Sequence, residues 1–187
     1  AAKLLLCHSR HRDISNDHRL AGERDRDVLR PDSRLREELL EGLRQINAID
    51  SRHCRQGAQL HLPGGLDLGS AVAVDTETMG LRPRRDRLCL AQLSAGDGNA
   101  HLVRFAPDSY GAPNLKALLS DESVTKLFHF ARFDIAVIER YLGVVAQPLY
   151  CTKIASKLAR TFTDRHGLRD LCHDLLGIDL NKEQQTS

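Results

Sequence analysis

The feature that most constrains the fold is a short apolar stretch, residues 71–74, that runs directly into two carboxylates, Asp75 and Glu77. Alanine and valine between glycine-containing turns are typical of a buried strand. Residues two apart on a strand project to the same side, so Asp75 and Glu77 leave its end together. Neighbouring carboxylates repel each other, and burying either one without a partner costs free energy. The pattern therefore indicates either a divalent cation held by both side chains or a strand that ends in a solvated turn.

Length and charge limit the class of protein. A chain of 187 residues is long enough for one domain with a hydrophobic core plus an appendage. Its net charge of +2 neither requires nor excludes a nucleic acid partner, so a basic surface for one must be local. No apolar run approaches the ~20 residues of a membrane span, and the five cysteines form no C-x-x-C pair. These observations predict a cytoplasmic protein that does not enter a membrane.

Residues 1–57 differ from the rest of the chain because Arg, Asp and His dominate them, with charges of both signs. Such a segment buries little, so we expect a loosely structured N-terminal extension. The exception is one amphipathic helix over about residues 32–49. Its apolar residues recur at helical spacing: Leu35, Leu39, Leu43 and Ile46. This stripe needs a surface to pack on, either the main domain of the same chain or a partner.

From about residue 58 the hydrophobic pattern becomes regular and predicts strands and helices in succession. Strands are expected at 60–62, 71–77, 88–93, 100–105, 124–128 and 144–150, and helices at 114–120, 131–142, 152–159 and 168–176. Residues 96–99 (G-D-G-N) are a hairpin signal. Three consecutive strands followed by alternating strands and helices predict an α/β fold, a mixed sheet flanked by helices.

A second polar cluster follows the strand at 124–128. The chain passes through His129 and begins a helix near Ala131, whose first turn holds Asp134. A structural role for Asp134 is open, since the N-terminus of a helix favours an anion. Parallel neighbouring strands align their carboxyl ends, so we expect Asp134 to approach Asp75 and Glu77. Three carboxylates at one sheet edge are the oxygen ligands that Mg²⁺ or Mn²⁺ prefers.

Two segments, 74–81 (V-D-T-E-T-M-G-L) and 129–134 (H-F-A-R-F-D), resemble the first and second motifs of the DEDD 3′–5′ exonucleases. Residues 87–93 (R-L-C-L-A-Q-L) are similar to the second strand of the ribonuclease D branch of that superfamily. The resemblance implies a ribonuclease H-like fold and a 3′–5′ exonuclease domain at residues 58–187. Residues 1–57 lie outside it.

The resemblance also implies a mechanism, the hydrolysis of phosphodiester bonds with two divalent metal ions, Mg²⁺ or Mn²⁺. Asp75, Glu77 and Asp134 are then both the catalytic residues and the metal ligands. The substrate is the 3′ end of a single-stranded nucleic acid. Five further residues of the two motifs are candidates for substrate binding: Thr78, Met79, Leu81, His129 and Arg132.

Each of these candidates has an alternative role in the fold. Met79 and Leu81 would either wedge against the terminal base or pack beneath the sheet, and His129 would either hold the terminal sugar or phosphate or serve the structure. The arginine-rich residues 82–87 either meet the substrate backbone or form a solvated loop. Lys153 is a further candidate phosphate contact, whereas Lys126 is expected to be an ordinary surface charge.

The chain departs from the family pattern at one place. The superfamily has a fourth carboxylate, which in the ribonuclease D branch belongs to a Tyr-x-x-x-Asp pattern on a later helix. No aspartate after Asp134 stands in that pattern, and His166 with Asp170 imitates a histidine variant of it too early in the chain. We therefore expect the domain to be C-terminally incomplete. With one metal ligand fewer, it is expected to be weakly active or inactive alone.

Three functions follow from these observations. The leading one is a 3′–5′ exonuclease domain of the ribonuclease D type, in RNA processing or degradation. The alternatives are a catalytically impaired nucleic-acid-binding module, which recruits a partner through the helix at 32–49, and a DNA-proofreading exonuclease. The strand at 88–93 favours RNA over DNA, but the discriminating contact to a 2′-hydroxyl cannot be read from a sequence.

Overall fold

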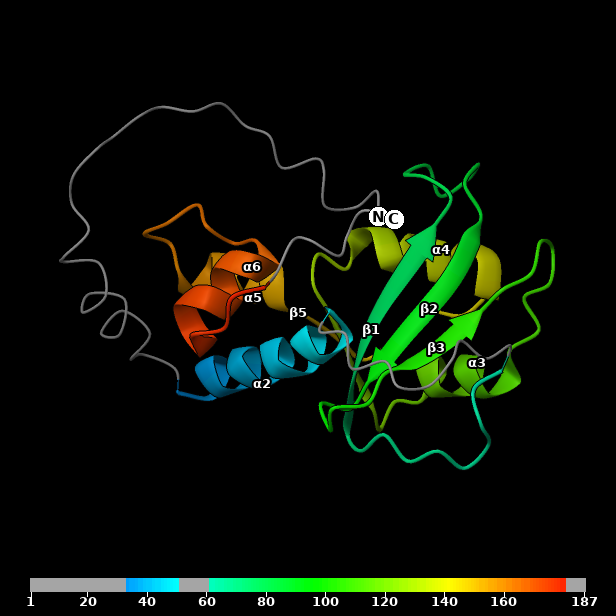
Figure 1. Cartoon of the computed structure of the whole chain (residues 1–187), viewed down its shortest axis with the longest axis horizontal. Helices are drawn as coiled ribbons and strands as arrows, with labels where there is room; N and C mark the ends of the chain where they lie inside the picture. Colours follow the sequence, from blue (N-terminus) through cyan, green and yellow to red (C-terminus); the bar gives the residue numbers. More distant parts are fainter. Residues whose placement is uncertain (1–32, 51–60, 181–187) are drawn as a thin grey trace.

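A five-stranded mixed sheet organises the computed structural model, which describes residues 33–50 and 61–180 (Figure 1). Its strands are β1 (Ala71–Thr78), β2 (Leu88–Ser94), β3 (His101–Arg104), β4 (Thr125–Phe128) and β5 (Leu149–Cys151). They lie in the order β3–β2–β1–β4–β5. β1, β2 and β3 form an antiparallel meander, whereas β4 and β5 run parallel to β1. The predicted α/β fold with a mixed sheet is confirmed, and β1 is its central strand.

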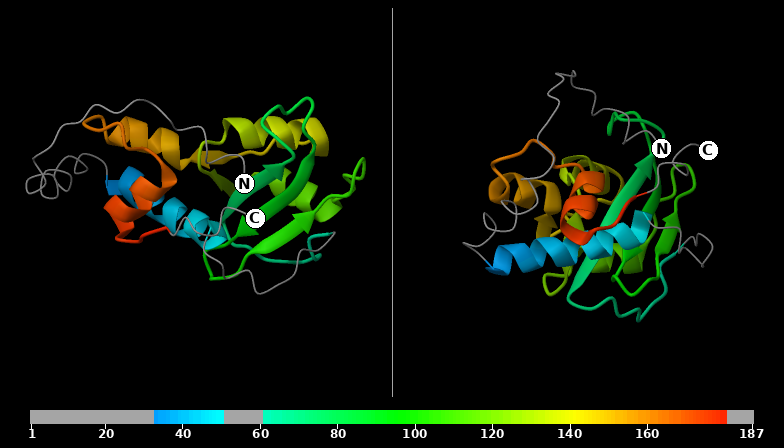
Figure 2. Two further views of the ribbon diagram at one scale, coloured as in Figure 1. Left: turned by 45° about the horizontal axis from the view of Figure 1, so that its top comes forward. Right: turned by 60° about the vertical axis from the view of Figure 1, so that its left-hand side comes forward.

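Helices cover both faces of this sheet (Figure 2). They are α2 (Ser33–Asp50), α3 (Pro113–Ser120), α4 (Arg132–Leu142), α5 (Thr152–Ala159) and α6 (Leu168–Leu171), which continues into a π-helical turn, η1 (Cys172–Leu176). Gly143 and Gly177, with left-handed φ of 68° and 69°, end α4 and η1. Among the described residues, no helix is both long and apolar enough to cross a membrane.

The alternation of side chains along β1 divides the core in two. Val72 and Val74 belong to the main core, which also contains residues of β2, α3 and α4. Ala73 faces the other side, where it meets Ile46 of α2 and Leu127 of β4. Because the period of a strand is two, Asp75 and Glu77 share the face of Ala73, and Thr76 shares the face of Val74. The fold therefore assigns the two carboxylates and the residue between them to opposite faces of the sheet.

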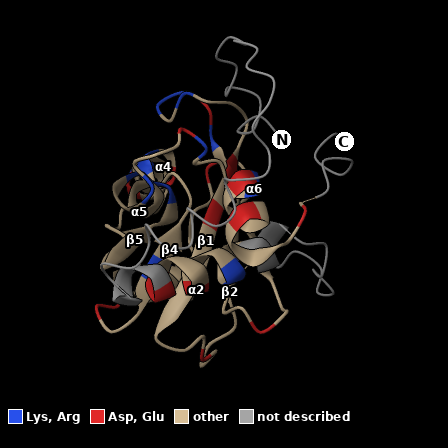
Figure 3. Ribbon diagram, turned by 90° about the vertical axis from the view of Figure 1, so that its left-hand side faces the viewer, with Lys and Arg blue, Asp and Glu red and all other residues tan. Residues whose placement is uncertain are grey.

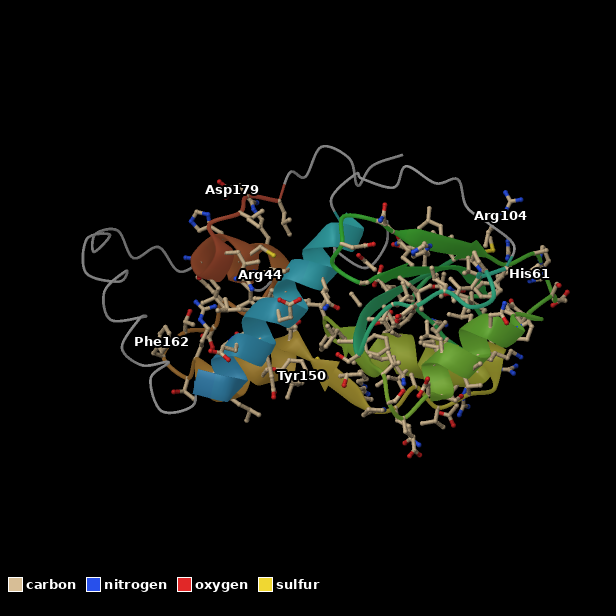
Figure 4. The ribbon with its side chains drawn as sticks, turned by 90° about the horizontal axis from the view of Figure 1, so that it is seen from below. Arg44, His61, Arg104, Tyr150, Phe162 and Asp179 are labelled. Atoms are coloured by element: carbon tan, nitrogen blue, oxygen red, sulfur yellow. The ribbon has the colours of Figure 1, made fainter. Side chains whose placement is uncertain are left out.

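The N-terminal helix α2 packs on the chain itself. Its buried leucines meet α5 and α6 in one cluster: Leu39, Leu43, Ala155 and Leu171. Tyr150 of β5 contacts this cluster and lies beside α2 (Figure 4). Of the two surfaces expected for the apolar stripe, the main domain is the one observed. Residues 1–32 and 51–60 and the side chain of Leu35 lie outside the described part, so the domain boundary near residue 57 stays a prediction.

Two predicted strands differ from the structure. Residues 61 and 62, the described part of the predicted lead-in strand, form no strand. The last strand, predicted over 144–150, occupies only Leu149–Cys151. Val144 and Ala146 pack into the main core from a loop, and Pro148 has no N–H to donate to a neighbouring strand. An apolar run is thus buried without being a strand.

Lys126 is not the surface charge that the sequence predicts. Its side chain is buried within β4, and Nζ donates to the carbonyl oxygens of Asp121, Val124 and Gln147 at 2.6, 2.7 and 2.5 Å. Burial lowers the pKa of the ammonium group. The three carbonyls replace the water that a lysine normally has around it. Lys126 therefore ties the start of β4 to the loop that precedes β5.

Candidate active site

Asp75 and Glu77 lie half-buried near the end of β1, on the face that Ala73 shares with α2. Gln92, directly opposite Asp75 on β2, donates from Nε2 to Asp75 Oδ2 at 3.4 Å. The ladder between β1 and β2 becomes irregular just after Glu77. Acidic residues are visible both on β1 and at α6 in Figure 3. The fold thus holds this pair of carboxylates on one face of the central strand, as the alternation predicts.

Asp134 reaches the same strand from α4, on the opposite face of the sheet. Its Oδ1 accepts hydrogen bonds from the Thr76 hydroxyl at 2.6 Å and from the Thr76 N–H at 3.2 Å. Both residues are about 1% exposed. Hydrogen bonds to a carboxylate are stronger than those between neutral groups, so they fix the orientation of Asp134. The residue that Asp134 binds stands directly between Asp75 and Glu77.

The three carboxylates fit a hard divalent cation by donor type, since Mg²⁺ and Mn²⁺ take oxygen ligands. They are not gathered around one point. Within residues 33–50 and 61–180, no group of three or more His, Cys, Asp and Glu side chains is arranged to hold a metal ion. The cause is the strand alternation, because Asp134 meets the face of Thr76 and the other two carboxylates leave from the opposite face. Bringing all three around one ion requires side-chain movement.

The turn after β1 carries three of the residues predicted to bind substrate. The Thr78 hydroxyl donates to the carbonyl oxygen of Gly80 at 2.5 Å. Met79 and Leu81 are 71% and 37% exposed. Of their two predicted roles, packing beneath the sheet is not observed. Both apolar side chains are accessible to a ligand beside Asp75 and Glu77.

The arginine-rich loop that follows is organised by its own aspartate. Asp86 accepts from the Arg82 N–H at 2.9 Å and from Arg85 Nε and Nη2 at 2.5 and 2.9 Å. The Arg85 guanidinium, and then the Arg82 N–H, lower the pKa of Asp86. Arg87 donates to the Phe105 carbonyl at 3.2 Å. Arg82 and Arg84, both exposed, are therefore the arginines of this loop best placed to meet an anionic ligand.

His129 is held within the fold. Its Nδ1 lies 2.9 Å from Thr152 Oγ1, and the Thr152 hydroxyl donates to the Phe128 carbonyl at 3.2 Å. The Thr152 hydroxyl proton is thereby used, so His129 Nδ1 donates to Thr152 Oγ1. Burial, followed by the charge of Lys153, lowers the pKa of His129 to about 4. The imidazole is neutral near pH 7, and the structural role predicted as an alternative is the one its contacts support.

Two residues of the second motif that follow His129, Phe130 and Arg132, have exposed side chains. Arg132, the first residue of α4, is exposed, as a substrate-binding role requires. Phe130, which was not among the predicted site residues, is 50% exposed and has a left-handed φ of 65°. The Lys153 Nζ lies 4.3 Å from the centre of its ring. A phenylalanine after a strand is ordinarily taken for core, so no pattern in the sequence singled it out.

The fold and this pair of motifs define a class of nuclease. A model of the 3′–5′ exonuclease family matches residues 58–187, and the chain belongs to this family. Within it, the chain is 34% identical over 116 residues to ribonuclease D of Granulibacter bethesdensis, a match that covers 62% of this chain and 29% of that protein. Ribonuclease D of Gluconacetobacter diazotrophicus gives the same identity and coverage. The chain therefore spans less than a third of the curated relatives it matches.

Solved structures of exonucleases also resemble this chain. Brucella melitensis NrnC with bound Mg²⁺ is 51% identical and superposes with a TM-score of 0.63, over 65% of this chain and 61% of that one. Escherichia coli RNase D is 30% identical with a TM-score of 0.50, over 63% of this chain and 31% of that one. The sheet of five strands with flanking helices is thus the ribonuclease H-like fold of these exonucleases.

Proposed function

We propose that this chain is a 3′–5′ exonuclease domain that hydrolyses phosphodiester bonds at the 3′ end of single-stranded nucleic acid, with RNA preferred to DNA. The observation that carries the proposal is the junction of β1 and α4. Asp75 and Glu77 share one face of the central strand, and Asp134 is hydrogen-bonded to the residue between them. Family membership of residues 58–187 supports this chemistry.

The relatives support the choice of substrate. Solved structures of Brucella melitensis NrnC include one bound to pGG. Escherichia coli RNase D is an exoribonuclease involved in structured RNA processing. Both proteins resemble this chain over about two thirds of its length, 66% for NrnC with pGG and 63% for RNase D, which favours an RNA end as ligand. An RNA-directed enzyme of this kind would act in the cytoplasm.

Asp75, Glu77 and Asp134 would hold two divalent ions, Mg²⁺ or Mn²⁺, and Brucella melitensis NrnC with bound Mg²⁺ supports this metal class. When bound, such ions supply an activated water and stabilise the leaving oxygen. The chain's own residues position the substrate. Met79 and Leu81 are exposed beside the carboxylates to contact the terminal base, and Arg82 and Arg84 are exposed to meet the phosphate backbone. Thr76 orients Asp134 through its two hydrogen bonds.

A second function is favoured by one observation. The described carboxylates are not gathered around a common point, because Asp134 is bound to Thr76 on the opposite face from Asp75 and Glu77. A nucleic-acid-binding module with impaired catalysis would have this arrangement. Both functions predict binding of single-stranded nucleic acid, but only the exonuclease predicts metal-dependent turnover.

The test uses a 5′-labelled single-stranded RNA of seven nucleotides, with Mn²⁺ or with EDTA. The exonuclease predicts stepwise shortening from the 3′ end that requires Mn²⁺ and is lost in Asp75→Asn and Glu77→Gln. Asp67→Asn is the matched control, since that carboxylate lies before β1 and, within residues 33–50 and 61–180, accepts its hydrogen bond from the Gly69 N–H at 2.8 Å. Binding without shortening would favour the impaired module. Shortening that persists in Asp75→Asn would contradict the assignment of the site.

A further inference from the structure

Phe130 stands out among the aromatic residues of the described chain because it is exposed where its neighbours are buried. Phe128 and Ala131 are 0% and 5% exposed, whereas Phe130 is 50% exposed. Its φ of 65° lies in the left-handed region, which a residue with a bulky side chain rarely adopts. Strained backbone of this kind is concentrated at binding and catalytic sites. The fold thus presents an aromatic ring to solvent at an energetic cost.

Lys153 lies over this ring. Its Nζ is 4.3 Å from the ring centre, which is the geometry of a cation–π contact. Within residues 33–50 and 61–180, Lys153 forms no ion pair with a carboxylate. An exposed ring with an ammonium group beside it offers one surface for a flat apolar group and one charge for an anion.

Both residues follow strand ends on the edge of the sheet that carries the carboxylates. β1 and β4 are parallel, with Ala73 paired to Leu127, so continuing the register brings Asp75 level with His129, one residue before Phe130. β4 and β5 are also parallel, and Phe128 pairs with Cys151, two residues before Lys153. The carboxyl ends of three adjacent strands therefore supply the carboxylates, the ring and the ammonium group in succession.

We propose that Phe130 and Lys153 form a nucleotide subsite, in which a base near the 3′ end stacks on the Phe130 ring while Lys153 meets the adjoining phosphate. The proposal rests on the proposed function, because it names how the same site holds its substrate. Every base has a π-face, so stacking on an aromatic ring is tolerant of sequence, and lysine adds attraction to the backbone without reading the base. A protein ligand would be expected to bury the same ring without these nucleotide requirements.

The first test uses the absence of tryptophan from the chain. Phe130→Trp introduces a single tryptophan at the subsite, and Val145→Trp introduces one at an exposed apolar position in the loop before β5. A single-stranded RNA of five nucleotides is titrated in Ca²⁺ as the metal, so that binding is observed under conditions chosen to limit turnover. The subsite predicts saturable quenching in Phe130→Trp and none in Val145→Trp. Binding of the RNA without quenching at position 130 overturns it.

The second test separates stacking from apolar contact. Phe130→Leu keeps an apolar side chain and removes the aromatic face, and it is expected to weaken RNA binding about tenfold, with Val145→Ala as the matched control. An abasic nucleotide at the last or the second-to-last position should weaken wild-type binding similarly, and the abasic substrate should abolish the difference between Phe130→Leu and wild type. Lys153→Met should reduce the slope of log affinity against log salt concentration by about 0.7.

The outcomes distinguish this subsite from the proposed function. Failure of the proposed function appears as absence of Mn²⁺-dependent shortening by the wild type, and quenching in Ca²⁺ would still support the subsite. Equal RNA affinity of Phe130→Leu and wild type overturns the subsite, even in a protein that shortens RNA. Thermal melting of each variant establishes that the fold is retained. In an active enzyme, Phe130→Leu should raise KM and leave kcat within a factor of about two.

Discussion

The contact between Thr76 and Asp134 joins two elements through a single pair of side chains. The hydroxyl at 2.6 Å is the shorter of the two donors to Asp134 Oδ1, and the backbone N–H at 3.2 Å is the other. A carboxylate in the core depends on such donors, because hydrogen bonds replace the water that it has lost. Thr76 is therefore a positioning residue for Asp134.

Thr76→Val tests this role, since valine keeps the shape and removes the hydroxyl. We expect the free energy of unfolding to fall by about 1–3 kcal/mol, because a buried carboxylate loses one of its donors. Chemical denaturation measures this loss, and Thr76→Ser should recover most of it. If metal-dependent turnover is present, Thr76→Val should raise the Mn²⁺ concentration needed for half-maximal rate. A valine variant as stable as wild type would show that the N–H alone is sufficient.

His129 gives a pH dependence of stability. Its pKa is about 4 in the folded chain, whereas an ordinary histidine, as in the unfolded chain, has a pKa of 6.5. The unfolded chain therefore binds a proton first as the pH falls. Its contribution is complete above pH 6.5 and is lost progressively between pH 6.5 and pH 4. At about 1.4 kcal/mol per pH unit, the loss between the two pKa values amounts to roughly 3–4 kcal/mol. In His129→Asn, which keeps a donor towards Thr152, the slope of unfolding free energy against pH should be smaller over this window.

Individual residues were the hardest to predict from the sequence. The sequence predicted that Asp134 approaches Asp75 and Glu77 at one sheet edge. Asp134 of α4 does reach β1, but strand alternation leaves the other two carboxylates on the opposite face, and the choice of Thr76 as its partner is a tertiary contact. The sequence predicts Lys126 as a surface charge. The three carbonyls that surround its ammonium group come from two separate loops and from the start of its own strand, and they meet only in the folded chain. Phe130 was overlooked because exposure of an aromatic ring depends on backbone conformation.

Among the elements, α2 contributes most unexpectedly to the core. It contacts β1, β2, β4, α5 and η1, although the charged segment around it predicted a loose appendage. The helix itself was predictable from its periodic leucines. Its docking surface was not, because the cluster that receives it is assembled from α5 and α6, more than a hundred positions later in the chain.

Leu43→Ala tests whether α2 is an integral element. Leu43 of α2 is 0% exposed and packs in the cluster with Ala155 and Leu171, so its truncation to alanine leaves a cavity. We expect a loss of about 2–4 kcal/mol in unfolding free energy, together with faster amide exchange in α2. The control is Arg44→Ala on the same helix, an exposed residue whose ion pair within the described part of the chain is to Glu41 at 3.4 Å. This change should alter stability by less than about 0.5 kcal/mol. Equal effects of the two variants would mean that α2 is not part of the folded core.

At the scale of the whole molecule, the sheet was predictable because its antiparallel half is local in sequence. The hairpin at 96–99 joins β2 to β3, and the order of strands and helices implied the mixed sheet. The length of β5 was less predictable, because the apolar residues before it, Val144 and Ala146, pack on the core from a loop and not from a strand. The net charge of +2 gives no general attraction to nucleic acid, so affinity must arise from local groups such as Arg82, Arg84 and Lys153.

Metal binding is expected to stabilise the molecule as a whole. An ion that binds the folded chain and not the unfolded one adds RT ln(1 + [L]/Kd) to the unfolding free energy. At a hundredfold excess over Kd this is about 2.7 kcal/mol, a rise of several degrees in Tm for a domain of this size. Mn²⁺ should produce this rise in wild type and EDTA should reverse it. Asp75→Asn should show neither effect, whereas the Asp67→Asn control should behave as wild type.

The docking of α2 has a consequence for how the chain is made. The ribosome delivers α2 before any strand of the sheet, yet the cluster that buries Leu39 and Leu43 includes Leu171 of α6. Until that residue has emerged, the leucines have no complete surface within the chain and face the cellular medium. Among the described helices, the one synthesised first is thus among the last elements to reach its final place, and a nascent chain arrested before residue 171 should expose it to proteases and chaperones.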